Sequence, residues 1–357
     1  MLESDNGDEL MNTNIAIIGY FRSGSTVNGG QGIKTAIVTD EIEKYLGHKN
    51  VKRIDTDNWK RHTLALVCRC VCSVLIKKNV LFLTDENGIK VFPILLSTAN
   101  IMHRCKIHYY VVGGWLTKYI EKNPQAAQAL KKLDAIYVEI PSMKKDLEEK
   151  GFRNIILVNK FRRITPVSTD MLIKPHQPYK LCFFARVMKE KGIEDAIKAV
   201  ETANKRAGEV KYSLDIYGAV DPGYESTFAE LQNGLPDYIK YKGIVDFRKS
   251  TEILKDYFAM VFPTFYKSEG YPNTVVDSYA AGLPIIATKW NYNEEIIKDY
   301  NDGILFDVGN IDQLVNAIEY LANNDKKYLE MRKACIRRCD EYNPSNALRQ
   351  VISNLKE

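Results

Sequence analysis

Two carboxylates eight residues apart raise the question of what chemistry this chain performs. In the segment SEGYPNTVVDSYAAGLPIIAT, Glu269 precedes a run of turn-forming residues and Asp277 lies within the apolar stretch that follows. The preceding segment AMVFPT predicts a strand, TVVDSYAA predicts a helix that ends at Gly282, and LPIIAT predicts the next strand. We therefore expect Glu269 in a loop at the carboxyl edge of a parallel sheet, and Asp277 one turn into the helix.

The start of that helix predicts an anion site. Gly270, Pro272 and Asn273 set up a helix N-terminus, whose free N–H groups and positive dipole end favour an anion. An anion site flanked by two carboxylates suits a diphosphate with a hydroxyl-bearing ring on either side, which describes a nucleotide sugar. The spacing alone is also compatible with an ordinary loop carboxylate and a surface helix residue, so other signals must decide.

Two further segments supply groups suited to phosphate. In FFARVMKEKG a strand ends at Arg186 and a loop carries Lys191 into the next helix, which predicts two cations at the carboxyl edge of the same sheet. Arg186 would stabilise the charge of a departing nucleotide. Near the N-terminus, GYFRSGSTVNGGQG places Gly29 and Gly30 before a helix, where backbone can approach a phosphate, although this is not the dinucleotide fingerprint.

Apolar runs alternate with amphipathic runs along the chain, which predicts an α/β protein with parallel sheets. Buried strands are expected at NIAIIGY, VLFLT, IHYYVV and AIYVEI, and again at LCFFARV, YSLDIYG, IKYKG and AMVFPT. Between the two series, NKFRRITPVSTDMLIKPHQPYK has no periodicity and is expected to connect two domains. We expect doubly wound Rossmann-like domains at residues 11–165 and 166–340 with an interdomain cleft, and a C-terminal helix in 341–357 that returns to the first domain.

Composition and charge limit the classes of function. The chain has 357 residues, 45% of them hydrophobic and 27% charged, as expected for a folded protein, and its longest uncharged runs are too short to span a bilayer. The acidic start MLESDNGDEL does not resemble a secretory signal, so we expect a cytoplasmic protein whose residues 1–10 are a leader.

The two halves of the chain differ in charge. Residues 1–170 carry 25 Lys and Arg against 18 Asp and Glu, whereas residues 171–357 carry 25 Lys and Arg against 27 Asp and Glu. The basic first half suits peripheral contact with an anionic membrane as well as it suits ordinary solvated helices, and no base-reading motif indicates nucleic acid.

The seven cysteines predict reduced thiols rather than a disulfide framework. Three of them cluster in RHTLALVCRCVCSVLIKKN. Helical spacing puts Cys68 and Cys72 on one face with Leu64 and Leu75, so we expect these four to be core residues. No second Cys or His pair lies at zinc spacing, and no metal site is expected.

Taken together, these segments resemble the retaining glycosyltransferases of family 4, which have the GT-B fold. The resemblance covers nearly the whole chain from Asn14 and is strongest from Leu181 to Phe306. Its marks are, in order, GGQG, ARVMKEKG, IYG, YKGIV, PTFYKSEGYPNTVVDSYAAGLPIIAT and NDGILF. It implies transfer of a sugar from a nucleoside diphosphate sugar with retention of the anomeric configuration, and no bound metal ion or other cofactor.

The resemblance also implies roles for individual residues. Arg186 and Lys191 would bind the diphosphate, Glu269 the sugar hydroxyls and Asp277 the ribose, which makes the first three the expected catalytic residues. The backbone positions expected at the donor are Gly218, Gly243, Ile244, Gly270, Tyr271, Pro272, Asn273 and Thr274. The expected acceptor is a glycan or a lipid-linked glycan of surface polysaccharide or glycolipid assembly, and a UDP-sugar is the favoured donor.

The sequence departs from the family pattern at two places. The second carboxylate is commonly Glu, so Asp277 is one methylene shorter. Many relatives have a His near the reacting centre where YYVVGGWL has Gly113 and Gly114. His103 and His108 are close in sequence, but lone histidines are usually structural and we expect neither to be a catalytic base.

Other classes of protein share this architecture. An NAD-dependent oxidoreductase would need the glycine fingerprint and a spaced acidic residue, which neither half has. A sugar-nucleotide epimerase or phosphorylase is an alternative enzyme, and a sugar-nucleotide-binding scaffold is the alternative that is not an enzyme. Product analysis with and without an acceptor distinguishes these alternatives.

Overall fold

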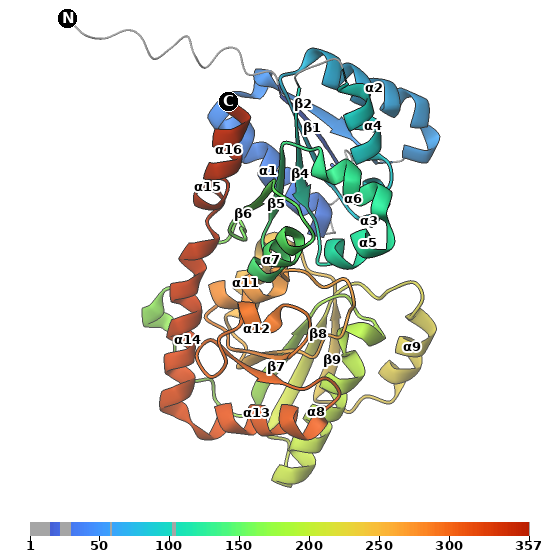
Figure 1. The fold of residues 1–357 in the computed structure, drawn as a ribbon. Helices are drawn as coiled ribbons and strands as arrows, with labels where there is room; N and C mark the ends of the chain where they lie inside the picture. The colour runs from blue at the N-terminus through green and yellow to red at the C-terminus, as the bar shows by residue number, and fades with distance from the viewer. Residues whose placement is uncertain (1–14, 22–29, 58, 102–104, 357) are drawn as a thin grey trace, which may run out of the picture. The chain divides into compact units, whose positions relative to one another are not determined.

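The computed structural model describes residues 15–21, 30–57, 59–101 and 105–356 (Figure 1). The chain forms two compact units, residues 1–161 together with 343–357, and residues 162–342. The domain limits expected from sequence, at 165 and 340, lie within a few residues of these. Within the described ranges no helix is long and apolar enough to cross a membrane.

The first unit is built on a parallel six-stranded sheet in the order β2-β1-β3-β4-β5-β6. Its strands are β1 (Ile15–Gly19), β2 (Val51–Asp55), β3 (Asn79–Thr84), β4 (Lys106–Val111), β5 (Ala135–Val138) and β6 (Ile155–Leu157). Its helices are α1 (Gly30–Leu46), α2 (Thr63–Ile76), α3 (Glu86–Ile89), α4 (Phe92–Ala99), α5 (Leu116–Lys122), α6 (Pro124–Lys131), α7 (Pro141–Glu149), α15 (Pro344–Ala347) and α16 (Arg349–Lys356). The four predicted strands are the four inner ones, whereas the two edge strands were missed because VKRID is largely polar and IIL is short.

The C-terminal helix α16 belongs to the first unit. The amide of Asn79, at the start of β3, donates to the carbonyl oxygen of Leu355 at 3.0 Å. The amide of Asn354 donates to the hydroxyl of Tyr137 in β5 at 3.1 Å. These polar contacts fix the helix to two inner strands of the sheet.

The second unit repeats the arrangement with a parallel sheet in the order β12-β11-β10-β7-β8-β9. Its strands are β7 (Tyr179–Phe184), β8 (Tyr212–Tyr217), β9 (Ile239–Gly243), β10 (Ala259–Phe262), β11 (Ile285–Thr288) and β12 (Gly303–Phe306). Its helices are α8 (Ile193–Ala207), α9 (Glu225–Asn233), α10 (Ser250–Leu254), α11 (Asn273–Ala280), α12 (Asn293–Ile296), α13 (Ile311–Asn323) and α14 (Asp325–Cys339). One core packs α8 and α13 on the sheet, and a second packs α10, α11 and α12 on it (Figure 1). Both sheets are doubly wound, as the alternation of the sequence predicts.

The predicted connecting segment packs on the second unit. The backbone N–H of Val167 donates to the carbonyl oxygen of Ala280 at the end of α11, at 2.9 Å. Arg332 of α14 donates to the carbonyl oxygens of Ile173 and Gly282, both at 2.7 Å. Gly282 takes φ +59°, the left-handed conformation expected after a helix end. The segment and α14 therefore hold the C-terminal end of α11 in place.

Candidate functional site

The strand order of the second sheet reverses between β7 and β10. β7 lies between β8 and β10, so the connections after β7 and after β10 leave the carboxyl edge of the sheet in opposite directions. Doubly wound sheets bind their ligands in the crevice that forms there. The two connections, residues 185–192 and 263–272, contain Arg186, Lys191 and Glu269. The structure thus brings the three predicted catalytic residues to one edge of one sheet.

Lys191 and Glu269 form an ion pair between these two loops. Thr264 supports it, because its Oγ1 donates to Glu269 Oε2 at 3.1 Å. The loops approach closely at Gly192, which takes φ +77° and where a Cβ would lie 2.2 Å from the carbonyl oxygen of Pro263. The Lys191 side chain is 14% exposed and that of Glu269 11%. The site therefore contains a cation whose position is fixed by a carboxylate.

Helix α11 begins at the same edge of the sheet. Its first residue, Asn273, follows Pro272, which provides no side-chain cap. The N–H of Val275 donates to the carbonyl oxygen of Pro272 at 3.3 Å, whereas the N–H groups of the two residues before it have no intrahelical acceptor. Thr274 Oγ1 donates to the carbonyl oxygen of Phe184 at 2.9 Å, which fixes the helix start to the end of β7. An uncapped helix N-terminus and a cation at one sheet edge are suited to an anion.

Tyr271 anchors the loop that leads into α11. Its hydroxyl lies 2.7 Å from that of Tyr342, which accepts from Arg338 Nη2 at 3.2 Å. Arg338 also pairs with the buried Asp302 at 2.9 Å. Burial raises the pKa of the Tyr271 hydroxyl, and the neighbouring Tyr342 adds to this. The side chain of Tyr271 is thus a neutral hydrogen-bonding anchor, and only its backbone is left for the donor role that the sequence predicts.

Asp277 lies one turn into α11, and its carboxylate faces Arg162. Asp277 Oδ1 accepts from Nε at 2.9 Å and Oδ2 accepts from Nη2 at 3.0 Å, with both side chains 3% exposed. Arg162 is the first residue of the second unit, and its N–H donates to the carbonyl oxygen of Tyr342 at 2.9 Å. A bidentate buried pair of this kind is strong and specific. The ribose contact of Asp277 stays a prediction, and a ribose would have to share the carboxylate with Arg162.

Sequence reasoning missed Arg162. The available signal was the basic pair FRR in the connecting segment, which says nothing about the direction of either side chain. The pair belongs to the basic first half of the chain, whose charge suits contact with an anionic membrane. That interpretation is wrong for Arg162, which is 3% exposed.

Arg186 is the most exposed of the three predicted catalytic residues. Its side chain is 57% exposed, and Nη1 lies 3.4 Å from Asp221 Oδ2. Exposed pairs of this kind contribute little stability because solvent screens them. Arg186 can therefore exchange Asp221 for a ligand at low cost.

Gly218 and Gly243, two of the glycines predicted at the donor, lie at the carboxyl ends of β8 and β9. Gly218 takes φ +141°, and a Cβ there would lie 1.9 Å from the carbonyl oxygen of Ala185, so a side chain would push the strand ends apart. Gly243 takes φ +78° beside open space, and Ile244 is 63% exposed. These backbone positions are accessible from the same edge of the sheet that carries Arg186.

The predicted Gly-rich loop lies almost wholly outside the described residues. Gly29 is outside them, and Gly30 is the first residue of α1. His103 is also outside them. His108 is structural, as predicted: its ring nitrogens lie 3.1 Å from the hydroxyl of Tyr137 and 3.1 Å from Oδ1 of Asn79. Burial, with a smaller effect of Lys106, lowers the pKa of His108 to about 4, so the ring is neutral.

The first unit contains a buried polar cluster that sequence reasoning missed. Glu139 directly follows β5, and its Oε2 lies 2.9 Å from Lys34 Nζ and 3.4 Å from Lys160 Nζ. Its Oε1 accepts from the hydroxyl of Tyr110 at 3.1 Å. Burial tends to raise the pKa of Glu139, but the two lysine charges and the hydrogen bonds outweigh it, and the pKa lies below its ordinary value. The sequence signal that could have indicated this cluster is Glu139 itself, a lone carboxylate at the carboxyl end of the predicted strand AIYVEI.

The prediction for the cysteine-rich helix is wrong. Cys68 and Cys72 are exposed, as are Leu64 and Leu75. The spacing correctly groups the four residues on one face of α2, but the helix packs on its sheet through the opposite face, which contains Cys70. Among the residues described, no group of three or more His, Cys, Asp or Glu side chains could hold a metal ion.

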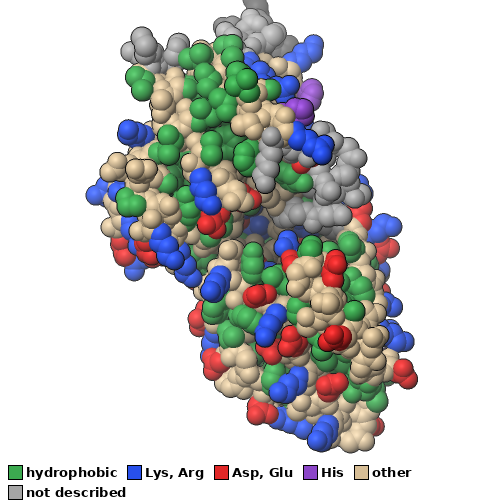
Figure 2. Space-filling view, turned by 90° about the vertical axis from the view of Figure 1, so that its right-hand side faces the viewer, with side chains coloured by type: hydrophobic (Ala, Val, Ile, Leu, Met, Phe, Trp, Pro, Cys, Tyr) green, Lys and Arg blue, Asp and Glu red, His purple; other side chains and the backbone are tan. Residues whose placement is uncertain are grey.

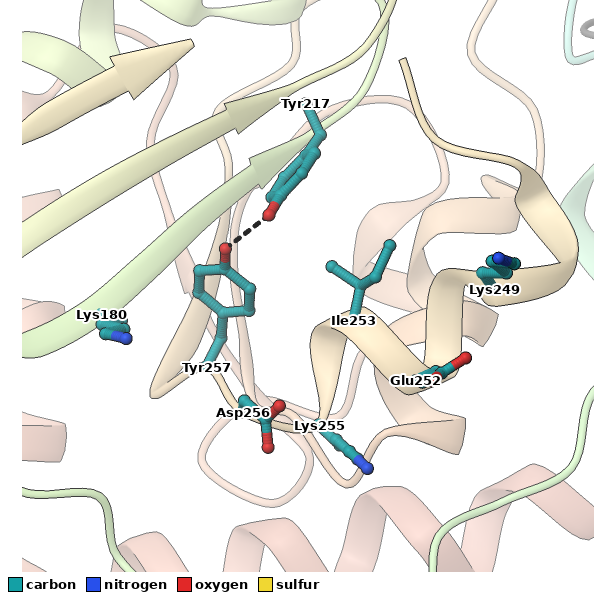
Figure 3. Close-up of a pocket in the computed structure, with 8 residues that line it drawn as sticks. All are labelled: Lys180, Tyr217, Lys249, Glu252, Ile253, Lys255, Asp256 and Tyr257. Carbon is teal, nitrogen blue, oxygen red and sulfur yellow. Dashed lines mark hydrogen bonds between the residues drawn. The ribbon is translucent and has the colours of Figure 1, made fainter. Parts of the chain in front are cut away.

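A separate pocket of about 460 Å³ lies in the second unit beside α10. The hydroxyls of Tyr217 and Tyr257 meet inside it at 2.8 Å (Figure 3), and Tyr257 also donates to Asp215 Oδ2 at 2.7 Å. Burial raises the pKa of the Tyr257 hydroxyl. None of the predicted donor-binding residues lines this pocket. The pocket is therefore distinct from the site at the carboxyl ends of β7 and β10.

Comparison with known proteins identifies one domain of the chain. Residues 169–338 match the family of glycosyl transferases group 1. They form a group 1 glycosyltransferase domain. This group 1 domain covers nearly all of the second unit and includes Arg186, Lys191, Glu269 and Asp277.

Individual relatives agree with this assignment. The GtfA subunit of the UDP-N-acetylglucosamine–peptide N-acetylglucosaminyltransferase of Streptococcus pneumoniae is 33% identical over 132 residues, which are 36% of this chain and 24% of that protein. The amylovoran biosynthesis glycosyltransferase AmsK of Erwinia amylovora is 23% identical over 186 residues, 51% of this chain and 45% of that protein. The matches thus span less than half the length of these curated relatives.

A solved structure extends the likeness to the whole chain. HepE of Anabaena, solved in complex with UDP, superposes with a TM-score of 0.71 over 96% of this chain and 99% of that one, at 13% sequence identity. This likeness shows the fold. Together with the two doubly wound sheets it assigns the GT-B fold that the sequence resemblance predicts.

Proposed function

We propose that the chain transfers a sugar from a uridine diphosphate sugar to an acceptor hydroxyl, with retention of the anomeric configuration. The observation that carries this proposal is the Lys191–Glu269 pair at the sheet edge where the uncapped helix α11 begins. A cation, a carboxylate and backbone N–H donors thus lie together where the strand order of the sheet reverses. These are the groups that a diphosphate sugar requires. Uridine is favoured because the pneumococcal relative is named for a UDP-sugar and the HepE structure holds UDP.

In this mechanism the bond between the anomeric carbon and the diphosphate oxygen breaks while the acceptor oxygen bonds to that carbon. Lys191, Arg186 and the α11 N-terminus stabilise the charge that develops on the diphosphate. Glu269 holds Lys191 in position before the donor binds and accepts hydrogen bonds from the sugar hydroxyls afterwards. The departing diphosphate takes the proton of the acceptor. The two side-chain cations supply positive charge at the diphosphate, so we propose that the reaction needs no metal ion.

We further propose that the first unit binds the acceptor, a glycan or a lipid-linked glycan of surface polysaccharide or glycolipid assembly, on the cytoplasmic side of the plasma membrane. The amylovoran relative supports a polysaccharide product. The basic first half of the chain supports an anionic or membrane-bound acceptor. The Lys34–Glu139–Lys160 cluster lies at the carboxyl edge of the first sheet, where an α/β unit presents its ligand-binding loops.

Product analysis tests the proposal. The chain is incubated with a set of UDP-sugars, with and without lipid-linked glycan acceptors, and UDP release is measured together with the anomeric configuration of the product by NMR. We expect UDP release that depends on acceptor and a product with the configuration of the donor. Conversion of the UDP-sugar without acceptor would indicate an epimerase, and formation of a sugar phosphate would indicate a phosphorylase. Binding of UDP-sugar without turnover under any condition would indicate a scaffold.

A further inference from the structure

Helix α2 of the first unit presents an apolar face to solvent. The residues that point outward are Leu64, Ala65, Cys68, Arg69, Cys72, Leu75 and Ile76. Only one of them is charged, and Leu64 is 79% exposed and Ile76 69% exposed. Large apolar side chains gathered on one exposed face indicate an interaction surface.

Helix α4 packs beside α2 and extends this face. Ile94 within α4 and its flanking residues Val91 and Ile101 are exposed, Ile101 to 79%. Figure 2 looks onto the side of the molecule that carries α2 and α4 in Figure 1, and shows hydrophobic side chains gathered over the upper part of the view with Lys and Arg beside them. We call these exposed residues of α2 and α4 the apolar face.

The charges along α2 have one sign. Between Asp57 and Asp85 the chain has five Lys and Arg and no acidic residue. Arg61, Arg69 and Lys78 are exposed, and Asp85 is engaged in capping α3, where it accepts from the N–H of Asn87 at 3.0 Å. The surface thus combines exposed apolar side chains with cations, and Glu86 at the start of α3 is the nearest exposed acid along the chain.

We propose that the apolar face docks on the surface of an anionic lipid bilayer. Apolar side chains enter the boundary between headgroups and acyl chains, while Arg61, Arg69 and Lys78 contact lipid phosphates. Trp59, 48% exposed at the start of this region, has the amphipathic ring that is enriched at membrane interfaces. A second copy of the chain is a poorer occupant, because a two-fold interface through this face would bring like charges together. The surface lies outside the donor site, and the inference does not depend on the proposed function.

Vesicle sedimentation tests this inference. The full chain is sedimented with vesicles of phosphatidylcholine and phosphatidylglycerol, and with vesicles of phosphatidylcholine alone. We expect binding to the anionic vesicles that weakens with salt. The pair Leu64→Ser and Ile76→Ser should weaken binding about tenfold or more by removing apolar contact. The triple change Arg61→Glu, Arg69→Glu and Lys78→Glu should weaken it by roughly a hundredfold.

Val210→Ser is the matched control, because Val210 is an apolar residue of the second unit that is 55% exposed. It should bind vesicles as the unchanged chain does, and the thermal unfolding of every variant checks that the fold is kept. Equal binding by the unchanged chain and both sets of variants would overturn the proposal. So would failure to bind either vesicle. If the chain instead forms a dimer that Leu64→Ser and Ile76→Ser abolish in velocity sedimentation, the face joins two copies and the proposal is wrong.

Discussion

Helices α2 and α11 both bury apolar side chains, but one also buries a charge while the other exposes large apolar residues. α11 buries a carboxylate, Asp277, and it can do so because Arg162 forms two hydrogen bonds to it. α2 is one of the most apolar segments of the chain, yet Leu64 and Ile76 lie in solvent. The composition of a helix therefore does not decide which side is buried.

The difference follows from what each helix packs against. α11 lies against β7 and β10 in the middle of its sheet, and α14, α10 and the connecting segment cover it. α2 connects the edge strand β2 to β3, and among the described helices α4 is the one that packs extensively along it. A polar side chain can be buried where another side chain forms hydrogen bonds to it. An apolar side chain stays exposed where no other part of the protein packs over it.

Arg162→Leu should lower the free energy of unfolding by about 3 to 5 kcal/mol, because it leaves the charge of Asp277 buried without its cation. Urea denaturation measures the change. The double change to Arg162→Leu and Asp277→Leu should recover much of the loss, since no charge then remains inside. Arg163→Leu, at the exposed neighbouring position, is the control and should change stability little. A loss for Arg162→Leu no greater than that of the control would show that the pair is not structural.

Lys191→Ala should lower turnover by about a hundredfold to a thousandfold, the usual effect of removing one preorganised contact to transition-state charge. Steady-state rates of UDP release measure it. Lys189→Ala is the matched control because Lys189 is exposed on the same short 3-10 turn. Near-normal turnover in a folded Lys191→Ala protein would remove this residue from the mechanism.

Glu139→Gln should destabilise the chain by about 2 kcal/mol at neutral pH, because the charged carboxylate stabilises Lys34 and Lys160. The pKa of Glu139 is lowered in the folded state, so its contribution is present above the unfolded pKa and is lost as pH falls through the folded one. The difference between the two proteins should thus shrink as pH falls below the ordinary value of 4.5. Thermal unfolding from pH 7 downward, with the half-exposed Glu148→Gln as control, measures this. A difference independent of pH would assign the effect to packing.

Leu64→Ser should change stability by only about 0.5 kcal/mol or less, because the side chain already lies in solvent. Val74→Ser, on the buried face of the same helix, should cost about 2 kcal/mol or more through lost burial and an introduced hydroxyl. Comparing the two in denaturant measures the orientation of α2 directly. Equal losses would mean that the outward face is covered in solution.

The sequence predicts most of the fold because buried strands and amphipathic helices have distinct periodicities. Three edge strands were not predicted: β2, which is largely polar, and β6 and β12, which are short. At the site, Lys191 and Glu269 were found from their positions after predicted strands. Their direct pairing, and the partner of Asp277, depend on side-chain directions and on a contact between residues 115 positions apart. The periodicity of apolar residues carries no information about side-chain directions or about such distant contacts. It also does not show which face of α2 packs on the sheet.

We propose that the second unit binds a nucleoside diphosphate at the edge shared by Lys191 and the start of α11. The most direct test is the thermal shift of the full chain with UDP, GDP, ADP and dTDP, each repeated with Lys191→Ala. A ligand that binds only the folded state stabilises it by about 2.7 kcal/mol at one hundred times its Kd. We predict a clear rise in Tm with UDP, a smaller one with the other nucleotides, and loss of most of the UDP shift in Lys191→Ala. No shift with any of the four nucleotides, or a UDP shift of equal size in Lys191→Ala, would contradict the claim.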